Sequence, residues 1–426
     1  MIREIRTGQT INIFRGYLSY VCGSVVWTRS HDMKKKTIRD IDIAGRRVLV
    51  RVDFNVPLLD TGEIEDDSRI RACLPTIDLL IEEGARVILC SHLGRPNGQV
   101  VENLRLVPVT DRLSLLLGMK VQALRDCIGP EVEASVSAMR DGEVVILENL
   151  RFHPGEEDND PVFAASLARL ADIYVNDAFG SCHRRHASVV GITRFLPSVA
   201  GLLLEKELVM LGGLLGNPGR PFAAIVGGAK VSGKLGVLGN IIPKVDMLFI
   251  GGGMSASFLA AKGFSVGNSP VEQERREYVN GLLKMADSSG VRILLPIDVL
   301  VAANAYESSG SQTVAVSAIP DHTSIVDIGP KTIALFVREL SACRTVFWNG
   351  PLGVYEVPEF SHGTYTIAGL LAELDAVTVI GGGSTASMVT GLGLADQMSH
   401  VSTGGGASLG FLAGDVLPGI AVLEDA

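Results

Sequence analysis

Short apolar segments recur along the chain and alternate with longer segments in which apolar residues return at a helical period. The apolar segments are rich in Val and Ile and predict strands at residues 47–52, 87–90, 144–147, 173–175, 223–226, 247–250, 345–347 and 377–380. The periodic segments predict helices at residues 70–83, 107–117, 161–170, 271–287 and 332–340. Apolar runs without alternation are typical of strands buried on both faces. The pattern therefore predicts an α/β protein with mostly parallel sheets covered by helices.

The alternation is interrupted at residues 201–220, which read as a helix followed by a Gly/Pro turn. Because 426 residues exceed the size that one hydrophobic core usually supports, we expect two lobes with their boundary in this segment. The expected lobes are residues 33–203 and 204–405. A helix that joins two sheets is a natural hinge element, so we expect hinge bending near Leu204–Leu215.

Charge, apolar runs and cysteine content indicate which binding partners and which cellular compartment to expect. The formal net charge is -9 and no basic stripe emerges, which argues against nucleic acid as the partner. No uncharged apolar run approaches the roughly 18 residues that span a bilayer, so no membrane partner is expected. The six cysteines lack a C-x-x-C pair and regular short spacing, which favours buried thiols over disulfides or a zinc site. We therefore expect a cytoplasmic protein.

Residues 1–32 differ from the rest of the chain. They hold four arginines, two acidic residues and an uncharged stretch from Gly16 to Thr28. A targeting peptide is one interpretation, but the segment lacks a clear small-x-small cleavage site and is not obviously amphipathic. We favour a non-core extension, or a start codon placed too early, because Met33 followed by three lysines is an ordinary beginning.

Cationic and amide side chains gather where the strands of the first half end. The candidates are Asp53, Asn55, Arg69, His92, Arg95, Arg151, His183 and Arg184. Ligands of open α/β sheets bind beyond the carboxyl ends of the strands, and the Arg fork pairs bidentately with carboxylate or phosphate. Each Arg alone is more typical of a surface ion pair, and the His residues are equally typical of a structural role. Four arginines together predict a small ligand that bears both groups, with its hydroxyl held by Asp53 and Asn55.

Glycine clusters end the strands of the second half. Residues 228–235 match the first seven positions of the pattern G-x-x-x-x-G-K-[ST], but Leu235 stands where a magnesium-binding hydroxyl belongs. A true P-loop is therefore not expected. Lys230 and Lys234 are four residues apart at an expected helix N-terminus, so they can lie on one face and reach the same phosphate chain.

Two further glycine runs, at residues 251–256 and 381–386, satisfy a loose G-x-G-x-x-A pattern. One such match is weak evidence for dinucleotide binding, and two fit nucleotide phosphates and close helix–strand packing better. Some of these glycines are expected to be purely steric. The loop 348–356 adds Asn349 and Glu356 as plausible ribose and phosphate contacts. An anion site and a polyphosphate site that face each other predict phosphoryl transfer.

Read together, these segments resemble the phosphoglycerate kinase family. The resemblance covers Lys35 to about Ile420 and rests on an ordered series of runs. The runs are RVDFNVP, SHLGRP, LENLRF, VNDAFG, HRRH (where the family usually has HRAH), EKEL, GGAKVSGK, GGGM, DIGPKT, WNGPLGVYE and HVSTGGGASL. Such a series is far more specific than any single motif.

The resemblance implies the reaction 3-phosphoglycerate + ATP ⇌ 1,3-bisphosphoglycerate + ADP in glycolysis, with Mg²⁺ accompanying the nucleotide. It also implies two Rossmann-like three-layer αβα lobes joined by a helical hinge. The N-terminal lobe would bind phosphoglycerate and the C-terminal lobe the nucleotide, while residues 406–426 pack back on the N-terminal lobe. The family expectation for the oligomeric state is a monomer.

The same resemblance assigns residues to roles. Phosphoglycerate would be held by Asp53, Phe54, Asn55, Arg69, His92, Leu93, Gly94, Arg95, Arg151 and Arg184. The nucleotide would be held by Lys234, Asn349, Glu356, Gly382, Gly383, Ser384 and Thr385. Arg69 and Lys230 would act on the transferring phosphoryl group, which both can reach only if the lobes close.

Three departures from the family pattern stand out. Ser384 occupies the position of an Asp that contacts the nucleotide-bound Mg²⁺, and a neutral hydroxyl is a weaker ligand for a hard cation. Gly233 sits where Asp is common, and Gly410 and Asp415 replace the usual Glu and Lys. A degenerate homologue that binds nucleotide with weak or no turnover is therefore an alternative. A nicotinamide-dependent dehydrogenase, suggested by the two glycine runs, leaves the arginines and the two lysines unexplained.

Overall fold

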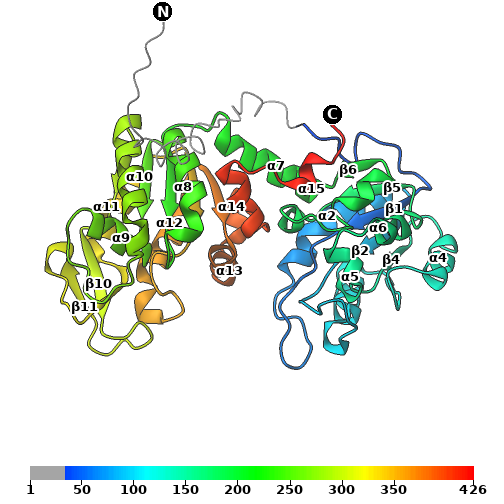
Figure 1. The fold of residues 1–426 in the computed structure, drawn as a ribbon, viewed down its shortest axis with the longest axis horizontal. Helices are drawn as coiled ribbons and strands as arrows, with labels where there is room; N and C mark the ends of the chain where they lie inside the picture. The colour runs from blue at the N-terminus through cyan, green and yellow to red at the C-terminus, as the bar shows by residue number, and fades with distance from the viewer. Residues whose placement is uncertain (1–33) are drawn as a thin grey trace, which may run out of the picture. The chain divides into compact units, whose positions relative to one another are not determined.

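The computed structural model describes residues 34–426, and two six-stranded sheets in which all neighbouring strands are parallel organise this part of the chain (Figure 1). The first sheet has the order β3-β4-β2-β1-β5-β6. Its strands are β1 (Arg47–Arg51), β2 (Arg86–Cys90), β3 (Gln122–Ala123), β4 (Val144–Ile146), β5 (Ile173–Asn176) and β6 (Ser198–Ala200). The chain adds β2, β4 and β3 on one side of β1, with β4 inserted between β2 and β3, and then places β5 on the other side of β1. The carboxyl ends of β1 and β5 therefore flank the position where ligands of such sheets bind.

The second sheet repeats this plan with the order β15-β14-β13-β7-β8-β9. Its strands are β7 (Phe222–Val226), β8 (Met247–Ile250), β9 (Arg292–Leu294), β13 (Thr345–Asn349), β14 (Val377–Gly381) and β15 (His400–Val401). The order reverses between β7 and β13, whose residues pair from Phe222 with Thr345 to Val226 with Asn349. The loops that follow these two strands therefore meet at the expected ligand position of the second sheet.

Successive apolar residues explain why the strands lie inside. Val48, Leu49 and Val50 of β1 are all fully buried, although alternate residues of a strand point to opposite faces. Val48 and Val50 share one core with Ile77 of the first long helix. The second sheet has a separate core that includes Phe249 and Trp348. The predicted α/β class with mostly parallel sheets is confirmed.

Helices connect most consecutive strands of each sheet. Those between strands of the first sheet are α2 (Ser68–Glu82), α3 (Val107–Leu117), α4 (Pro130–Ser137), α5 (Pro154–Glu157) and α6 (Pro161–Ala168). Later in the chain come α7 (Leu202–Leu215), α8 (Leu235–Ile241), α9 (Met254–Ala261), α10 (Arg276–Ser289), α11 (Pro330–Leu340), α12 (His362–Glu373), α13 (Gly383–Gly391), α14 (Gly406–Ala413) and α15 (Pro418–Ala421). The five helices expected from periodicity are all present, and α3 has the predicted bounds.

One predicted helix start is wrong. The pattern placed it at Val271, whereas α10 begins at Arg276 after a short 3-10 turn at Gln273–Arg275. The reason is that Glu272 turns its carboxylate toward another segment, where it accepts hydrogen bonds from the backbone N–H groups of Val231 (2.7 Å) and Ser232 (2.9 Å). Glu272 has ψ 85°, which is outside the helical region.

A small antiparallel sheet was not predicted. It has the order β11-β10-β12 and consists of β10 (Asp298–Ala302), β11 (Gln312–Ala315) and β12 (Ser324–Ile328). Most of β11 is exposed, so it lacks the apolar run that marked the other strands. Edge strands of this kind are held by backbone pairing and leave little trace in hydrophobicity.

The segment predicted as a hinge forms the helix α7. Its first turn is capped by the buried Asp177, whose carboxylate accepts from the N–H groups of Leu203 (2.9 Å) and Leu204 (3.1 Å). Burial raises the pKa of Asp177 to about 6. Further along α7, the buried Glu207 accepts from the ring of His400 at 2.8 Å and from the N–H of Thr403 at 2.7 Å. The helix thus bonds Asp177, which follows β5, and His400 and Thr403, which lie in and after β15, while bending about it stays a prediction.

The end of the chain packs beside β6 of the first sheet (Figure 1). The backbone N–H of Glu424 donates to the carbonyl of Ser198 (3.0 Å), and the N–H of Lys36 donates to the carbonyl of Glu424 (2.9 Å). Asn176, at the end of β5, donates to the carbonyl of Gly419 at 3.1 Å. These contacts agree with a segment that folds back, although the proposed domain limits remain predictions and residues 1–32 lie outside the described part.

Within residues 34–426 the five cysteines, Cys73, Cys90, Cys127, Cys182 and Cys343, are free and buried, as expected. Cys22 lies outside the described residues. No helix of the described chain combines the length and the apolar character that crossing a membrane requires.

Candidate active site

The carboxyl ends of β1 and β2 bring Asp53, Asn55 and Gly94 together. The Asn55 side-chain oxygen accepts from the backbone N–H of Gly94 at 2.8 Å, which joins the loops after the two strands. The Asp53 carboxylate accepts from the Arg69 guanidinium at 2.8 Å. Arg69 projects from the first turn of α2 and is half-buried, while Asp53 is buried. The loop after β1 therefore positions the Arg69 guanidinium. Phe54 in the same loop is fully buried and anchors the loop.

Arg151 is a buried cation with donors that have no partner. It lies in a 3-10 turn, Leu150–Phe152, directly after β4, and is 2% exposed. One terminal nitrogen donates to the carbonyl of Gly94 at 2.7 Å. Nε lies 3.2 Å from a carboxylate oxygen of Glu157 without hydrogen-bond geometry, so Nε and the second terminal nitrogen are buried and unpaired. Burial lowers the pKa of Arg151, and a buried charge with free N–H groups is suited to an anionic ligand.

Buried His92 lies within the same group of cations. Its Nδ1 is 3.0 Å from a terminal nitrogen of Arg51, and since the guanidinium can only donate, the ring proton sits on Nε2. Burial, together with the charges of Arg51, Arg151 and Arg184, holds the pKa of His92 well below its usual value. The neutral ring is thus a polar contact and not a further charge.

Two residues that support this group were missed in the sequence. Arg51 reads there as the last residue of a strand, but it is buried and donates to Ser188 (2.9 Å) as well as to His92. Glu156 is fully buried and accepts from the Ser188 hydroxyl at 2.6 Å. Burial alone would raise the pKa of Glu156, but a bond from His186 and the charge of Arg51 leave it lowered. No local pattern distinguishes such residues, because only the packed fold buries them.

The remaining candidates of the first sheet differ in exposure. Leu93 is buried, and its backbone exchanges hydrogen bonds with the side chain of Asn149. Arg95 and His183 are exposed, and Arg184 is half-buried close enough to affect the titration of His92. Within residues 34–426, the guanidinium of Arg184 has no ion-pair partner at a carboxylate. Arg151 and Arg184 are therefore both available to an anion.

The glycine loops of the second sheet pack against one another. The N–H of Gly227 donates to the carbonyl of Asn349 (2.9 Å), and the N–H of Gly228 donates to the carbonyl of Pro351 (2.8 Å). A Cβ on Gly227 would lie 2.1 Å from the carbonyl oxygen of Pro351, so only glycine permits this approach. At Gly252, φ is +63° and a Cβ would lie 2.7 Å from the nitrogen of Gly228. These glycines are steric, as expected for some of them.

Lys234 lies inside this junction of loops. Its ammonium group donates to the carbonyls of Gly227 (2.5 Å) and Asn349 (2.8 Å), so it joins the loops after β7 and β13. Lys230 is exposed. The expected α-helical relation between the two lysines is wrong, because both precede α8, which begins at Leu235, and Ser232–Lys234 form a 3-10 turn. The N–H groups of Val231 and Ser232 at the start of that turn donate to the Glu272 carboxylate, so the turn already binds an anionic group.

Burial lowers the pKa of Lys234 from 10.5 to about 7. Between these two values the unfolded chain binds a proton that the folded chain lacks, so this group makes stability rise with pH. We expect Lys234→Met to remove that contribution, flattening the rise in the free energy of unfolding between pH 7 and 8.5. Urea unfolding of both proteins at the two pH values measures it. Equal pH slopes in the two proteins would contradict the assignment.

The helix α13 presents its N-terminus where β14 ends. Gly382 precedes it with φ +90°, and a Cβ there would lie 2.6 Å from the amide nitrogen of Asn349. Thr385 is buried and its hydroxyl accepts from the N–H of Gly350 at 2.7 Å. Gly383 and Ser384 are exposed in the first turn, where N–H groups have no partner within the helix. The structure thus brings Asn349, Gly382 and Thr385 together. Glu356 is exposed and takes no part in these contacts.

Comparison with known proteins decides the family. The phosphoglycerate kinase family model matches residues 38–415. The chain belongs to the phosphoglycerate kinase family. The phosphoglycerate kinase of Moorella thermoacetica is 52% identical over 393 residues, covering 92% of this chain and all of the relative. That of Pelotomaculum thermopropionicum is 54% identical with the same coverage.

Solved phosphoglycerate kinase structures share the fold. The enzyme from Coxiella burnetii has a TM-score of 0.83 and 38% identity, covering 91% of this chain and 98% of that one. The enzyme from Pyrococcus horikoshii has a TM-score of 0.80 and 32% identity, with the same coverage. The chain is accordingly an ATP-dependent phosphotransferase of this family with two αβα lobes, and neither a dehydrogenase nor a degenerate homologue is supported.

Proposed function

We propose that this phosphoglycerate kinase transfers a phosphoryl group reversibly between 1,3-bisphosphoglycerate and ADP, giving 3-phosphoglycerate and ATP. The observation that carries the proposal is the buried Arg151, which keeps two unpaired nitrogen donors beside His92 and Arg184. A ligand that bears carboxylate and phosphate groups satisfies these donors. The ligand contacts are assigned to Asp53, Phe54, Asn55, Arg69, His92, Leu93, Gly94, Arg95, Arg151 and Arg184.

The nucleotide is assigned to the glycine junction of the second sheet. Its contacts are Lys234, Asn349, Glu356, Gly382, Gly383, Ser384 and Thr385. The N-terminus of α13 offers backbone N–H groups and a positive dipole end, both of which favour a polyphosphate. The side chain of Lys230 is exposed and can move to contact the transferring phosphoryl group. Lys234 instead fixes the loops after β7 and β13 to each other.

Phosphoryl transfer depends chiefly on in-line positioning and on neutralising charge on the equatorial oxygens. We assign these tasks to Arg69 from the first sheet and Lys230 from the second. Asp53 holds Arg69 in place before the ligand arrives. We expect the two groups to face each other once the hinge closes, which also excludes the water that would hydrolyse the acyl phosphate.

Among the described residues, no group of three His, Cys, Asp or Glu side chains lies at Ser384. Within residues 34–426, the group of three metal-ligating side chains lies at Asp126, Cys127 and His153, and not near α13. Mg²⁺ usually keeps several waters and binds through nucleotide phosphates with one or two carboxylates. We therefore propose that the Ser384 hydroxyl would be the protein group beside a nucleotide-bound Mg²⁺, which would supply neutralisation of phosphate charge.

Ser384→Asp tests this assignment. A carboxylate at that exposed position should tighten binding of the magnesium–nucleotide complex, and we expect about a tenfold gain for one added charge-assisted contact of roughly 1.4 kcal/mol. Isothermal titration of ADP with and without Mg²⁺ measures the gain, which should be confined to the magnesium form. Ser387→Asp, on the next turn of α13 and also exposed, is the matched control. An unchanged Mg²⁺ dependence would assign the contact to another group.

A coupled assay tests the proposed reaction as a whole. ATP formation from 1,3-bisphosphoglycerate, ADP and Mg²⁺ is expected, and it should be absent without either substrate. Nucleotide binding without turnover would overturn the proposal. We further propose that the enzyme acts as a cytoplasmic monomer. Light scattering at several protein concentrations should give the mass of one 45.2 kDa chain.

A further inference from the structure

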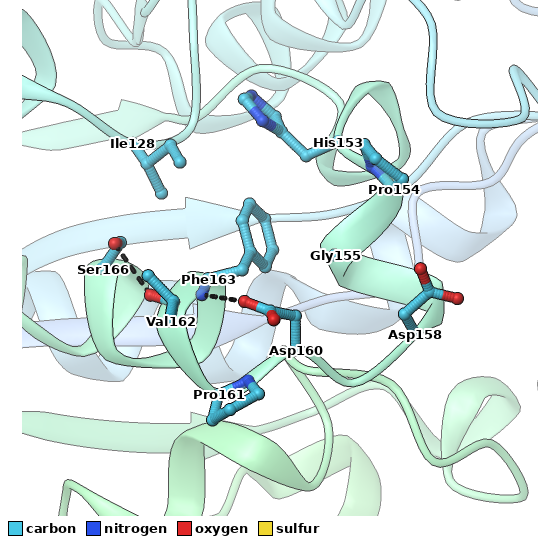
Figure 2. Close-up of a pocket in the computed structure, with 10 residues that line it drawn as sticks. All are labelled: Ile128, His153, Pro154, Gly155, Asp158, Asp160, Pro161, Val162, Phe163 and Ser166. Atoms are coloured by element: carbon cyan, nitrogen blue, oxygen red, sulfur yellow. Dashed lines mark hydrogen bonds between the residues drawn. The ribbon is translucent and has the colours of Figure 1, made fainter.

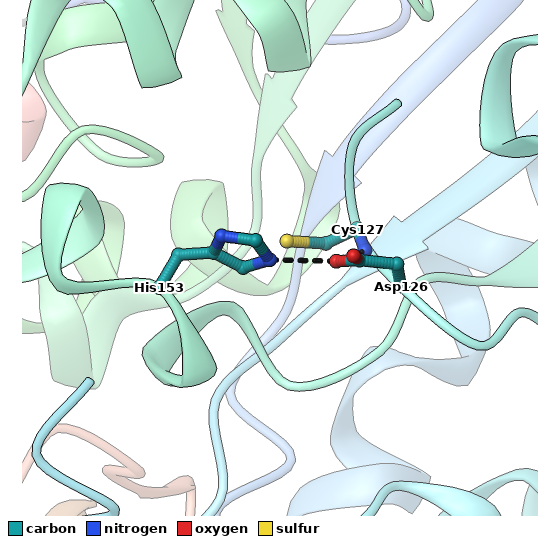
Figure 3. Close-up of side chains that lie close together, drawn as sticks. All are labelled: Asp126, Cys127 and His153. Atoms are coloured by element: carbon teal, nitrogen blue, oxygen red, sulfur yellow. Dashed lines mark hydrogen bonds and ion pairs between the residues drawn. The ribbon is translucent and has the colours of Figure 1, made fainter. Parts of the chain in front are cut away.

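Three potential metal ligands meet outside the proposed active site. The ligand atoms of Asp126, Cys127 and His153 all lie within 4.8 Å of one another, and their side chains converge in Figure 3. Asp126 and Cys127 follow β3, whereas His153 follows the turn that carries Arg151. None of the three is assigned to phosphoglycerate or nucleotide. The fold therefore gathers a carboxylate, a thiol and an imidazole from two separate loops.

This set of donors selects one class of cation. Thiolate and imidazole are ligands of zinc-type ions, whereas Mg²⁺ and Ca²⁺ prefer oxygen. Tetrahedral bonds of about 2.0–2.3 Å place neighbouring donor atoms about 3.2–3.8 Å apart. The His153 ring now bonds the Asp126 carboxylate at 2.6 Å, so a cation requires that contact to lengthen by about 0.6 Å. Asp126 is exposed, and its side chain can rotate to allow this change.

The other two ligands are held by their surroundings. Cys127 is fully buried, and its backbone N–H donates to the Asp126 carboxylate at 2.6 Å. The His153 ring packs on Phe163 with centroids 5.4 Å apart. His153 also lines a hollow of about 530 Å³ together with Ile128 and Phe163 (Figure 2). The hollow reaches one of the three ligands, His153, and the exposed Asp126 leaves room for a water molecule as a fourth ligand.

We propose that Asp126, Cys127 and His153 form a binding site for one zinc-type divalent cation, with water completing the coordination. Binding releases the Cys127 thiol proton to solvent and involves no change of oxidation state. The ion would tie the loop after β3 to the turn at Leu150–Phe152 and so stabilise the folded chain. None of the three ligands is among the assigned substrate contacts, so the proposed cation site is separate from the proposed reaction.

Titration of the reduced, chelator-treated full chain with Co²⁺ tests the proposal. We expect one equivalent to bind with a thiolate-to-cobalt charge-transfer band, Zn²⁺ to displace it, and either ion to raise the melting temperature. Cys127→Ser should abolish the band, and His153→Gln should weaken binding by about 100-fold or more. Asp126→Asn, at an exposed position, should also weaken binding and keeps the test valid if Cys127→Ser fails to fold.

Matched controls are Cys343→Ser, another buried thiol, and His322→Gln, an exposed imidazole. Both should bind Co²⁺ like the unaltered chain. A missing charge-transfer band, or a band that survives Cys127→Ser, would show that the Asp126–His153 contact is only a hydrogen-bonded pair beside a core thiol. The Cys127→Ser, His153→Gln and Asp126→Asn proteins should also keep their phosphoryl transfer activity. That result would show that a loss of cation binding is unrelated to the proposed reaction.

Discussion

Arg69→Ala should lower kcat on the order of 10³-fold or more, because a single arginine aimed at a transferring phosphoryl group typically contributes that much. The side chain is half-buried, and its ion pair with Asp53 at 2.8 Å fixes its direction before the substrate binds. A partly exposed ion pair contributes only about 0–1 kcal/mol to stability. We therefore expect nearly unchanged thermal unfolding, so the loss can be attributed to the transition state. Steady-state assays with both substrates saturating measure it.

Arg71→Ala is the matched control for this variant. Arg71 lies two residues further along α2, is exposed, and pairs with Asp67 at 2.9 Å. Its removal should change kcat by less than about twofold, since surface substitutions away from the site act only weakly. If Arg69→Ala and Arg71→Ala gave the same rate, Arg69 would have no role in charge neutralisation.

Arg151→Met should weaken phosphoglycerate binding by about 10²–10⁴-fold, the equivalent of losing two charge-assisted hydrogen bonds. The same change should stabilise the ligand-free protein by about 1–2 kcal/mol, because two buried unpaired nitrogens disappear while one bond to Gly94 and a partly exposed ion contact with Glu157 are lost. Calorimetric titration with 3-phosphoglycerate and urea unfolding without ligand measure the two effects. Opposite signs for affinity and stability distinguish a binding residue from a structural one.

Arg169→Met serves as the control for Arg151. Arg169 is exposed and pairs with Glu133 at 3.0 Å, so its loss should leave both quantities nearly unchanged. A destabilised Arg151→Met protein with normal affinity would reverse the interpretation and make Arg151 a core support for the loop at Gly94.

The two parallel sheets could be predicted because each of their main strands is a short run of apolar residues that is visible in the local sequence. Val48–Val50 are continuous apolar residues, and burial of both faces follows from that run alone. The antiparallel sheet at residues 298–328 could not, since β11 is mostly exposed and its pairing is made by backbone atoms. The start of α10 was misplaced for a similar reason, because Glu272 is held by the N–H groups of Val231 and Ser232, distant in sequence.

Candidate site residues were easier to name than their roles. Arg and Gly at strand ends predict an anion site, because ligands of parallel sheets bind there. By their spacing alone, Lys230 and Lys234 were both expected to reach the same phosphate chain, yet the fold exposes Lys230 and places Lys234 among carbonyl groups. Arg51 looked like an ordinary strand residue and instead supports His92. The cysteine spacing argued against a zinc site, and the cation site that we propose depends on His153, which only the fold brings to Cys127.

The sequence alone determined the class of fold, the strand cores and the residue types at the strand ends, because each depends on a short stretch of chain. The tertiary structure decided which of those side chains lose water and which keep unpaired donors. Three of these features depend on residues far apart in the chain. They are the burial of Arg151, the hydrogen bonds from Lys234 to carbonyl groups, and the hydrogen bond between Asp126 and His153. Desolvation and the pKa values that follow from it are properties of such contacts, so no local pattern encodes them.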